Sequence, residues 1–482
     1  MQLAAILRII GLLLMIFSIA MLPPVLVGLI YGDGAILPFM TAFGVNLVAG
    51  ALLWFPVRNY HRELRIRDGF VVVVVFWLVL GMIGSLPFYF SENPMLTFTD
   101  SVFESVSALT TTGATVITGI DALPRSILFY RQQLQWMGGM GIIVLAVAIL
   151  PMLGIGGMQL YRAETPGPMK DNKLTPRITE TAKALWYIYL GLTIACAVAY
   201  WLSGMDAFDA IGHSFSTVAL GGFSTHDASM GYFNSALIEM IAVVFMLLAG
   251  INFSLHFMSW RALTLKPYIH DPEVRTYFTL LSMTAVLTIL YLYVTGAFDL
   301  GSALHHGLFQ AVSIGTTTGF TTSEYYYWPG FLPVLLLFTS FIGGCAHSTS
   351  GGMKVIRFLL LYRQGIREIK RLIHPNALIP VKIGNKPVAE SVINAVWGFF
   401  SLYVASFVII MLTVMATGVD HITSFSAVAA CINNLGPGLG EVGAHYGNVN
   451  DTAKWILSFA MVLGRLEIFT LLVLFSPDFW RK

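Results

Sequence analysis

Four short strings, each with a glycine among small or polar residues, decide how this chain folds. They are Thr110-Thr111-Thr112-Gly113-Ala114-Thr115, Leu220-Gly221-Gly222-Phe223-Ser224-Thr225, Thr316-Thr317-Thr318-Gly319-Phe320-Thr321 and Asn433-Asn434-Leu435-Gly436-Pro437-Gly438. Each string lies between two long apolar segments, so the chain contains an internal repeat, and a repeat dictates architecture. Four copies of a short turn inside an apolar chain predict a pore lined by backbone carbonyls on a pseudo-four-fold axis.

Composition indicates that the chain lies in a membrane. Of its 482 residues 56% are hydrophobic and only 11% are charged, whereas soluble domains carry about 25% charged residues. Cys196, Cys345 and Cys431 lie in apolar or small-residue surroundings without metal-ligand spacing, which predicts packing roles and no disulfide framework. We therefore expect an all-α, polytopic membrane protein. Residues 8–30 are long enough to span, so they are not read as a cleaved signal peptide.

Apolar stretches of spanning length predict ten transmembrane segments, one of them interrupted in its middle (329–362). The segments lie near 8–30, 36–56, 70–90, 127–153, 184–203, 233–260, 277–296, 329–362, 391–417 and 454–475.

A shorter, semi-apolar stretch precedes each of the four strings. These stretches lie near 98–110, 206–218, 302–314 and 421–433. Each is too short to cross ~30 Å of hydrocarbon as a helix that rises ~1.5 Å per residue. We therefore expect four half-helices that end at the glycine turns. Residues able to cap a helix N-terminus stand near their starts: Asp100-Ser101, Asp206 with Asp209, Ser302 and Thr423-Ser424.

The predicted repeat unit is a span, a half-helix, a glycine turn and a second span. Four units follow an N-terminal pair of spans. The expected organisation is an N-terminal two-helix domain and four pore repeats, the third with an interrupted second helix: 1–68, 69–155, 156–262, 263–365 and 366–482. Irregular backbone at membrane depth is tolerated only where protein or a water-filled cavity satisfies its polar groups. Four re-entrant turns that meet on one axis fulfil that condition.

Basic residues predict the orientation, because cytoplasmic loops are enriched in Lys and Arg. They concentrate within 58–67, 162–183, 261–275, 357–386 and 481–482. The opposite side carries only Arg125, Arg131 and Lys454. The asymmetry places both termini in the cytoplasm and the four glycine turns near the outer face.

The residue types in the four strings suit a dehydrated monovalent cation. Backbone carbonyls supply oxygen ligands without a fixed charge, and glycine permits the dihedrals that turn successive carbonyls toward an axis. The strings contain no Asp or Glu, which favours K⁺ or Na⁺ over a divalent ion; the alternative is that they are ordinary loop turns. The predicted filter residues are Thr110, Thr111, Thr112, Gly113, Leu220, Gly221, Gly222, Thr317, Thr318, Gly319, Asn434, Leu435 and Gly436.

A small-residue site recurs in the span after each filter. The sites are Gly138-Gly139-Met140-Gly141, Ala249-Gly250-Ile251-Asn252, Gly343-Gly344-Cys345-Ala346-His347 and Gly464-Arg465-Leu466-Glu467. Close helix packing explains the glycines but not Arg465, which costs at least ~2.5 kcal/mol against lipid. We expect Arg465 to project into the permeation path below the filter, where it repels cations until it is displaced or paired with Glu467. A buried structural ion pair is the alternative.

The interrupted span reads GGCAHSTSGGMK from Gly343 to Lys354. Each glycine costs about 1 kcal/mol of helix propensity, so we expect the run to unwind into a movable loop beneath the filter, with Lys354 inside the membrane. Such a loop is a candidate gate; a kinked, packed helix is the alternative. Together with Arg465 and Glu467, the predicted gate residues are Gly343, Gly344, Ser348, Ser350, Gly351, Gly352 and Lys354.

Other ionisable residues have weaker interpretations. Acidic residues near the half-helices either concentrate cations at the outer mouth or cap helices: Asp100, Glu104, Asp206, Asp209 and Asp420. The histidines of the half-helices show no metal spacing and are predicted to be structural: His213, His305, His306 and His421. The only metal ion expected is K⁺ at the filter.

The whole chain resembles the superfamily of K⁺ transporters, most closely the bacterial Trk-type potassium-uptake membrane subunits of the TrkH/KtrB family. The resemblance rests on the TTTGA-, LGGFST-, TTTGFTT- and NNLGPGLG-type filters, on GGCAHSTSGGMK and on GRLE with Arg465. The N-terminal pair of spans, 8–56, favours the Trk type over the related Ktr type.

The resemblance implies properties that composition does not. Members are homodimers in the bacterial inner membrane with one pore per subunit, and a cytosolic ring of TrkA-type subunits binding NAD or ATP controls the gate. The family's filter glycines correspond to Gly113, Gly222, Gly319 and Gly436, its intramembrane loop to 343–354 and its constriction arginine to Arg465. A single glycine per repeat replaces the TVGYG of tetrameric K⁺ channels, which predicts weaker discrimination against Na⁺.

The leading hypothesis is a gated, passive K⁺ conduit without enzyme activity, bound cofactor or nucleic-acid partner. The runner-up is a coupled K⁺/H⁺ or K⁺/Na⁺ symporter, which needs a titratable or ion-specific group in the path; Glu467 is the candidate. A membrane-embedded enzyme is disfavoured because the sequence suggests no paired carboxylates, metal cluster or nucleophile–base set at membrane depth.

Overall fold

The computed structural model describes residues 2–60, 66–139, 141, 178–384 and 386–481. Within them the chain is mostly helical; the described strands are one short antiparallel hairpin, β1 (Lys382–Ile383) and β2 (Lys386–Pro387). The second half of the predicted 127–153 span, and with it the boundary near 155, lies outside the described residues. The predicted all-α membrane fold is confirmed, and all three cysteines are free and buried.

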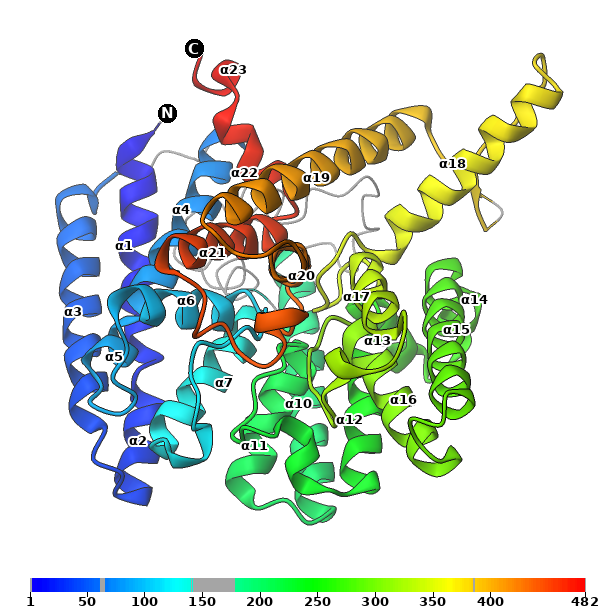
Figure 1. Cartoon of the computed structure of the whole chain (residues 1–482). Helices are drawn as coiled ribbons and strands as arrows, with labels where there is room; N and C mark the ends of the chain where they lie inside the picture. The colour runs from blue at the N-terminus through cyan, green and yellow to red at the C-terminus, as the bar shows by residue number, and fades with distance from the viewer. Residues whose placement is uncertain (1, 61–65, 140, 142–177, 385, 482) are drawn as a thin grey trace.

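The N-terminal pair packs through two glycines. It consists of α1 (Leu3–Ile19), α2 (Leu22–Tyr31) and α3 (Ile36–Trp54), followed by η1 (Phe55–Val57), and it lies at one edge of the molecule (Figure 1). A Cβ on Gly11 would lie 2.7 Å from the carbonyl oxygen of Gly50, and one on Gly50 would lie 2.8 Å from that of Gly11. The two backbones therefore touch where only glycine fits.

The rest of the chain forms four units with the same order of elements. Unit one contains α4 (Ile66–Gly84), α5 (Leu86–Phe90), the half-helix α6 (Phe98–Leu109), η2 (Ile120–Ala122) and α7 (Arg125–Gly139). Unit two contains α10 (Ile178–Leu202), the half-helix α11 (Ala207–Ala219), η4 (Ser229–Phe233), α12 (Ala236–Ala249) and α13 (Phe253–Ala262).

Units three and four repeat this order. Unit three contains α14 (Lys266–His270), α15 (Pro272–Val294), the half-helix α16 (Leu300–Gly315), η5 (Tyr325–Tyr327), α17 (Leu332–Ile342) and α18 (Val355–Ile373). Unit four contains α19 (Glu390–Ala416), the half-helix α20 (His421–Ile432), η6 (Gly440–Val442), α21 (Asp451–Arg465), α22 (Phe469–Leu472), η7 (Val473–Phe475) and α23 (Pro477–Trp480). Both termini lie on the same side of the molecule (Figure 1). The exact domain boundaries remain predictions.

The half-helices lie where the sequence predicts them, but two of their four caps do not. The capping side chains are Thr97, Asp206, Asp299 and Asp420. Asp206 was predicted, and capping was one of the two roles predicted for Asp420; Thr97 and Asp299 were not predicted. Asp100, Ser302 and Thr423 lie three residues into their helices, and their backbone N–H groups donate to the cap residue. Polar residues are common at both positions, so composition alone does not separate them.

Two spans that the sequence predicts as continuous are sharply bent. Six described helices or helix pairs are long and apolar enough to cross a membrane, and the bent pairs α12–α13 and α21–α22 raise the number to eight. The pairs bend by 95° and 109°, so the continuous spans predicted over 233–260 and 454–475 are wrong. Both breaks, like the interruption at 343–354, fall at the small-residue site after a filter.

Contacts within the fold explain the first of these breaks. A Cβ on Gly250 would lie 2.2 Å from the hydroxyl oxygen of Tyr277, so α12 ends against α15. Asn252 then starts a new helix, because its side-chain oxygen accepts a hydrogen bond from the Ser254 N–H at 2.8 Å. At the second break Glu467 and Ile468 adopt positive φ, which no helix allows.

We predict that Gly464→Ala destabilises the protein. A Cβ on Gly464 would lie 2.1 Å from the carbonyl oxygen of Ile432, at the end of α20, and overpacking of this kind costs about 1–3 kcal/mol. Gly44→Ala is the matched control, because Gly44 also lies in a helix and nothing comes within 4 Å of its Cβ position. Thermal unfolding of the detergent-solubilised protein measures both; equal midpoints for the two variants would contradict the packing argument.

Candidate ion pathway

All four glycine strings have the same unusual backbone. The glycines Gly113, Gly222, Gly319 and Gly436 have φ between 78° and 96°, and the residue two positions earlier in each string is also left-handed. Those earlier residues are Thr111, Leu220, Thr317 and Asn434, with φ of 55°, 55°, 62° and 53°. A left-handed residue other than glycine costs about 1–3 kcal/mol and persists only where its surroundings hold it. The four turns are therefore built to one geometry despite their different side chains.

The four turns meet in a closed ring. A Cβ on Gly113 would lie 2.2 Å from the carbonyl oxygen of Gly221, and one on Gly222 would lie 2.1 Å from that of Thr318. A Cβ on Gly319 would lie 2.1 Å from the carbonyl oxygen of Leu435. The ring closes because a Cβ on Gly436 would lie 2.6 Å from the carbonyl oxygen of Thr112. Each glycine thus faces the carbonyl that precedes the next glycine, and the contacts run round all four turns.

Threonine hydroxyls hold the first and third turns. The Thr110 hydroxyl donates to the Val106 carbonyl at 2.7 Å and lies 2.7 Å from the Thr112 hydroxyl. Thr316 makes the corresponding contacts, at 2.8 Å with the Val312 carbonyl and 2.7 Å with the Thr318 hydroxyl. These side chains are buried and bonded to the turn itself.

The second turn uses a side chain from another helix, and the fourth uses its own asparagine. The Gln135 amide donates to the Gly221 carbonyl at 2.6 Å, and its oxygen accepts from the Phe223 N–H at 3.1 Å. A Cβ on Gly221 would lie 2.4 Å from the Gln135 amide carbon, so Gln135 fills the space that threonine fills in turns one and three. In turn four the Asn434 amide donates to the Thr112 hydroxyl at 3.0 Å. Sequence reasoning missed Gln135, although a glutamine in a transmembrane helix was a usable signal.

A buried ion pair connects the outer ends of turns one and two. The carboxylate of Glu104 lies 2.8 Å from the Arg131 guanidinium, and both side chains are about fully buried. Glu104 also accepts from the Val116 N–H at 3.0 Å, just past the first turn. Arg131 donates to the Ser224 carbonyl at 3.2 Å and lies over the ring of Phe223, just past the second. Glu104 therefore stabilises the two turns by its ion pair. The predicted roles, which were to concentrate cations or to cap a helix, are both wrong for this residue.

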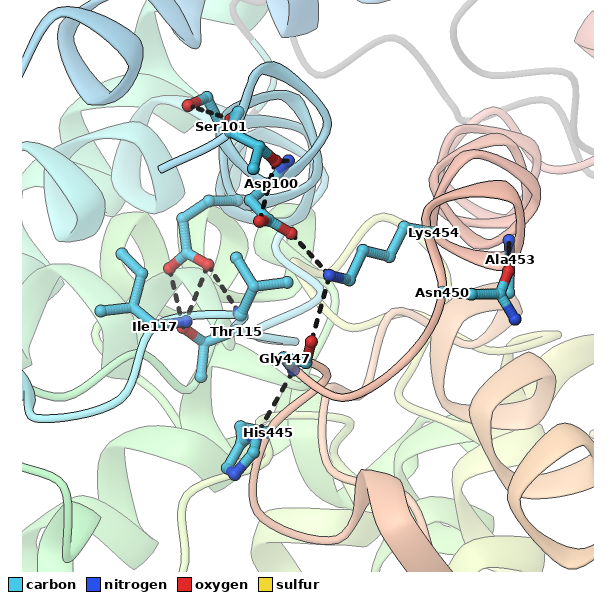
Figure 2. Close-up of polar contacts among 12 residues, drawn as sticks. Asp100, Ser101, Thr115, Ile117, His445, Gly447, Asn450, Ala453 and Lys454 are labelled. Carbon is cyan, nitrogen blue, oxygen red and sulfur yellow. Dashed lines mark hydrogen bonds and ion pairs between the residues drawn. The ribbon is translucent and has the colours of Figure 1, made fainter. Parts of the chain in front are cut away.

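Asp100 joins the first half-helix to the fourth unit. Its carboxylate lies 2.6 Å from the Lys454 ammonium, which also donates to the Gly447 carbonyl at 3.2 Å. Figure 2 shows Lys454 reaching from the start of α21 toward both groups. The positive charge of Lys454 thus compensates the negative charge of Asp100, while Asp206 and Asp420 cap their half-helices.

A cavity of ≈ 470 Å³, on the side of the ring that the sequence predicts to face outward, is lined by all four ring glycines. In its wall, the two ring nitrogens of His226 lie 2.5 Å from Asp121 and 3.2 Å from Asp209. Burial lowers the pKa of His226, but the two carboxylates outweigh it, so the net pKa is raised. This link between units one and two is strongest when His226 is protonated and weakens as pH rises through that raised pKa.

The segment 343–354 is unwound, as predicted, and lies directly beneath the ring. Thr349 donates from its hydroxyl to the Val218 carbonyl of unit two at 2.9 Å. The Ser350 hydroxyl donates to the Thr316 carbonyl of unit three at 2.8 Å. The Gly352 N–H donates to the Asn433 carbonyl of unit four at 3.1 Å. The loop thus binds the inner ends of three turns directly.

Arg465 completes the contact with the first unit. Its guanidinium donates to the Thr111 hydroxyl at 3.1 Å and to the Thr349 carbonyl at 3.3 Å. It also donates to the carbonyls of Gly138 and Gly139 in α7, the latter at 2.8 Å. The positive charge therefore lies against turn one and the loop.

The predicted pairing of Arg465 with Glu467 is not what the described residues show. The Glu467 carboxylate accepts a hydrogen bond from Arg357 in α18. Residues two positions apart do not share a face even in a continuous helix, and Glu467 has a positive φ at the bend between α21 and α22. Lys354 is buried, and its ammonium donates to the Ser350 carbonyl within the loop.

Sequence reasoning missed one residue that holds both ends of the loop. The carboxylate of Glu273, in the first turn of α15, accepts from the Ala346 N–H at 2.7 Å and from the Ile356 N–H at 3.1 Å. Ile356 belongs to the first turn of α18, so one carboxylate ties the loop to the helix that follows it. In the sequence Glu273 looks like an ordinary acidic residue near a helix start.

Comparison with known proteins agrees with this geometry. The family model of TrkH cation transport proteins matches residues 36–482. The chain belongs to the TrkH family. Over the full length of both chains it is 61% identical to the Trk system potassium uptake protein TrkH of Vibrio parahaemolyticus and 57% identical to that of Escherichia coli K12. The crystal structure of the potassium transporter TrkH from Vibrio parahaemolyticus superposes with a TM-score of 0.91 at 58% identity, covering all of both chains. The resemblance expected from the motifs is confirmed.

Proposed function

We propose that this TrkH-family chain takes up K⁺ across the bacterial inner membrane through a gated pore whose filter is the ring of four glycine turns. The observation that carries the proposal is the closure of the ring, in which each glycine faces the carbonyl of the next turn. Relatives named as potassium uptake proteins support the choice of ion. K⁺ is then the transported ion, and the chain needs no bound cofactor and acts as no enzyme.

The chemistry of the ring supports a monovalent cation. Carbonyl oxygens replace the hydration shell of such an ion without a net charge that would trap it. Two acidic side chains of the first half-helix are engaged, because Glu104 pairs with Arg131 and Asp100 with Lys454. The threonine, glutamine and asparagine contacts described above hold the turns and keep the carbonyls in place.

The arrangement beneath the ring supports a closed gate. The loop 343–354 binds the inner ends of three turns, and Arg465 joins it to the fourth. A cation that leaves the ring inward meets a fixed positive charge and a hydrogen-bonded loop. Opening requires that the loop release Thr316 and that Arg465 release Thr111.

In this proposal, α18, the helix that follows the loop, transmits the movement that opens the gate. α18 projects beyond the body of the molecule on the side of the termini (Figure 1). It exposes Tyr362, Ile369 and Leu372 together with basic residues, a surface suited to a protein partner. In this proposal the subunit works as a homodimer, both termini are cytoplasmic, and a cytosolic ring of TrkA type, responding to NAD or ATP, moves α18.

A current measurement separates the conduit from its alternative, a coupled K⁺/H⁺ or K⁺/Na⁺ symporter. We expect purified protein in a planar bilayer to carry a current that reverses at the K⁺ equilibrium potential. Obligatory coupling would shift the reversal potential with the gradient of the second ion, and that result would overturn the conduit. The pairing of Glu467 with Arg357 argues against Glu467 as a free proton carrier.

Gln135→Leu tests the filter assignment. The substitution removes one hydrogen bond to the Gly221 carbonyl, worth about 1 kcal/mol, so we expect the preference for Rb⁺ over Na⁺ to fall about fivefold. The measurement is ⁸⁶Rb⁺ uptake into proteoliposomes with Na⁺ as competitor. Gln133→Leu is the matched control, because Gln133 lies on the same helix but donates to the Ala20 carbonyl of the N-terminal pair. An equal loss of Rb⁺ preference in both variants would contradict the filter assignment.

Arg465→Ala tests the barrier beneath the ring. A charge that adds ~1.4 kcal/mol to the barrier slows passage about tenfold, so we expect ⁸⁶Rb⁺ flux to rise by about that factor. Arg465→Lys keeps the charge and should leave flux much closer to that of the wild type. Unchanged flux in the alanine variant would remove Arg465 from the permeation path.

A further inference from the structure

A glutamate and two histidines converge away from the filter ring, between units two and three. Glu239 lies in the first turn of α12, and His305 and His306 lie in the half-helix α16. One possible ligand atom of each residue lies within 4.8 Å of the others. The sequence predicts purely structural histidines here, because the third group comes from a different unit and no spacing along the chain reveals it.

The cluster contains polar atoms with few partners. Glu239 is only 2% exposed, and its Oε2 lies 2.8 Å from His305 Nε2. Among the described residues, neither atom has a hydrogen bond to any other group. A buried carboxylate is costly unless a charge or hydrogen bonds compensate it, and one neutral imidazole supplies at most a single hydrogen bond and no charge. A bound cation would satisfy both atoms at once.

The second histidine is held in orientation. His306 Nδ1 lies 3.0 Å from the Thr322 hydroxyl, and the ring has a second nitrogen for a metal ion. Histidines that bind metals usually have their ring fixed by such an outer contact. His305 and His306 are only partly buried, so an ion has access to the cluster.

We propose that Glu239, His305 and His306 form a binding site for a divalent transition-metal ion of the Zn²⁺ class. Two neutral imidazoles and one carboxylate suit Zn²⁺, Co²⁺ or Ni²⁺, whereas Ca²⁺ and Mg²⁺ prefer all-oxygen sets. Three protein ligands leave a fourth position for water, as in open zinc sites. The lone carboxylate leaves a bound dication with one net positive charge.

The site has a direct mechanical connection to the ring. α16 runs from His305 and His306 into the third turn, whereas Glu239 belongs to unit two. A bound ion therefore fastens the third half-helix to α12 at the start of both helices. Thr322, the partner of His306, also lines the cavity on the outer side of the ring. Zn²⁺ added on that side lowers ion flux by restraining α16.

Binding is measured apart from transport, so that the two can fail separately. The full-length protein in detergent, treated with a chelator and dialysed, is titrated calorimetrically with Zn²⁺ alone. We expect one equivalent per chain, and an affinity weakened about tenfold or more by His305→Gln or by His306→Gln. His421→Gln, at the start of the fourth half-helix α20, is the matched control and should leave the affinity unchanged.

The results that would contradict the metal site differ from the result that would contradict its effect on ion flux. Absence of binding to the wild type at millimolar Zn²⁺, or equal binding to the double His305→Gln/His306→Gln variant, overturns the site. If the variants fail to fold, protection of His305 and His306 in the wild type from diethyl pyrocarbonate by Zn²⁺ replaces them, and unprotected histidines overturn it. If Zn²⁺ binds but ⁸⁶Rb⁺ uptake is unchanged, the proposed restraint on α16 is wrong. The metal site itself is then still supported.

Discussion

The approach of each ring glycine to the carbonyl of the next turn is the constraint on which the rest of this structure depends. A Cβ at any of the four positions would lie 2.1–2.6 Å from that oxygen, well inside any allowed contact. The four turns therefore sit at membrane depth only as a set. Each half-helix ends at the ring. The Glu104–Arg131 ion pair holds the residues that follow the first and second turns. An isolated unit would expose its irregular backbone to lipid, where nothing satisfies its polar groups.

The inner side of the ring poses the same problem of unsatisfied polar groups, and the chain solves it with a second irregular segment. The carbonyls of Val218, Thr316 and Asn433 end their half-helices facing inward, and each receives a hydrogen bond from the loop 343–354. In an open state water or ions would have to take over these bonds. The loop is thus a structural partner of the ring, and in the proposed gate these same hydrogen bonds are the ones that opening must break.

How much the sequence reveals depends on how local each signal is. The half-helices and the unwound 343–354 follow from length, apolar content and glycine density, which are properties of one segment, and the structure has them where predicted. The bend at Gly250 depends on Tyr277 in another helix, so no local pattern announces it. The partner of Glu467 and the role of Glu273 depend on which helices become neighbours. Pairwise geometry of this kind is absent from a single sequence.

In the second turn, the side chain of Gln135 from α7 fills the space that a threonine fills in turns one and three. This has a consequence for how the sequence can evolve. The Gln135 amide lies where a Cβ on residue 221 would be, although the two residues are far apart in the sequence. A threonine at 221, matching turns one and three, fits only if residue 135 shrinks in the same lineage. We therefore expect the two positions to covary among descendants of this protein, because removal of the asymmetry requires two substitutions together.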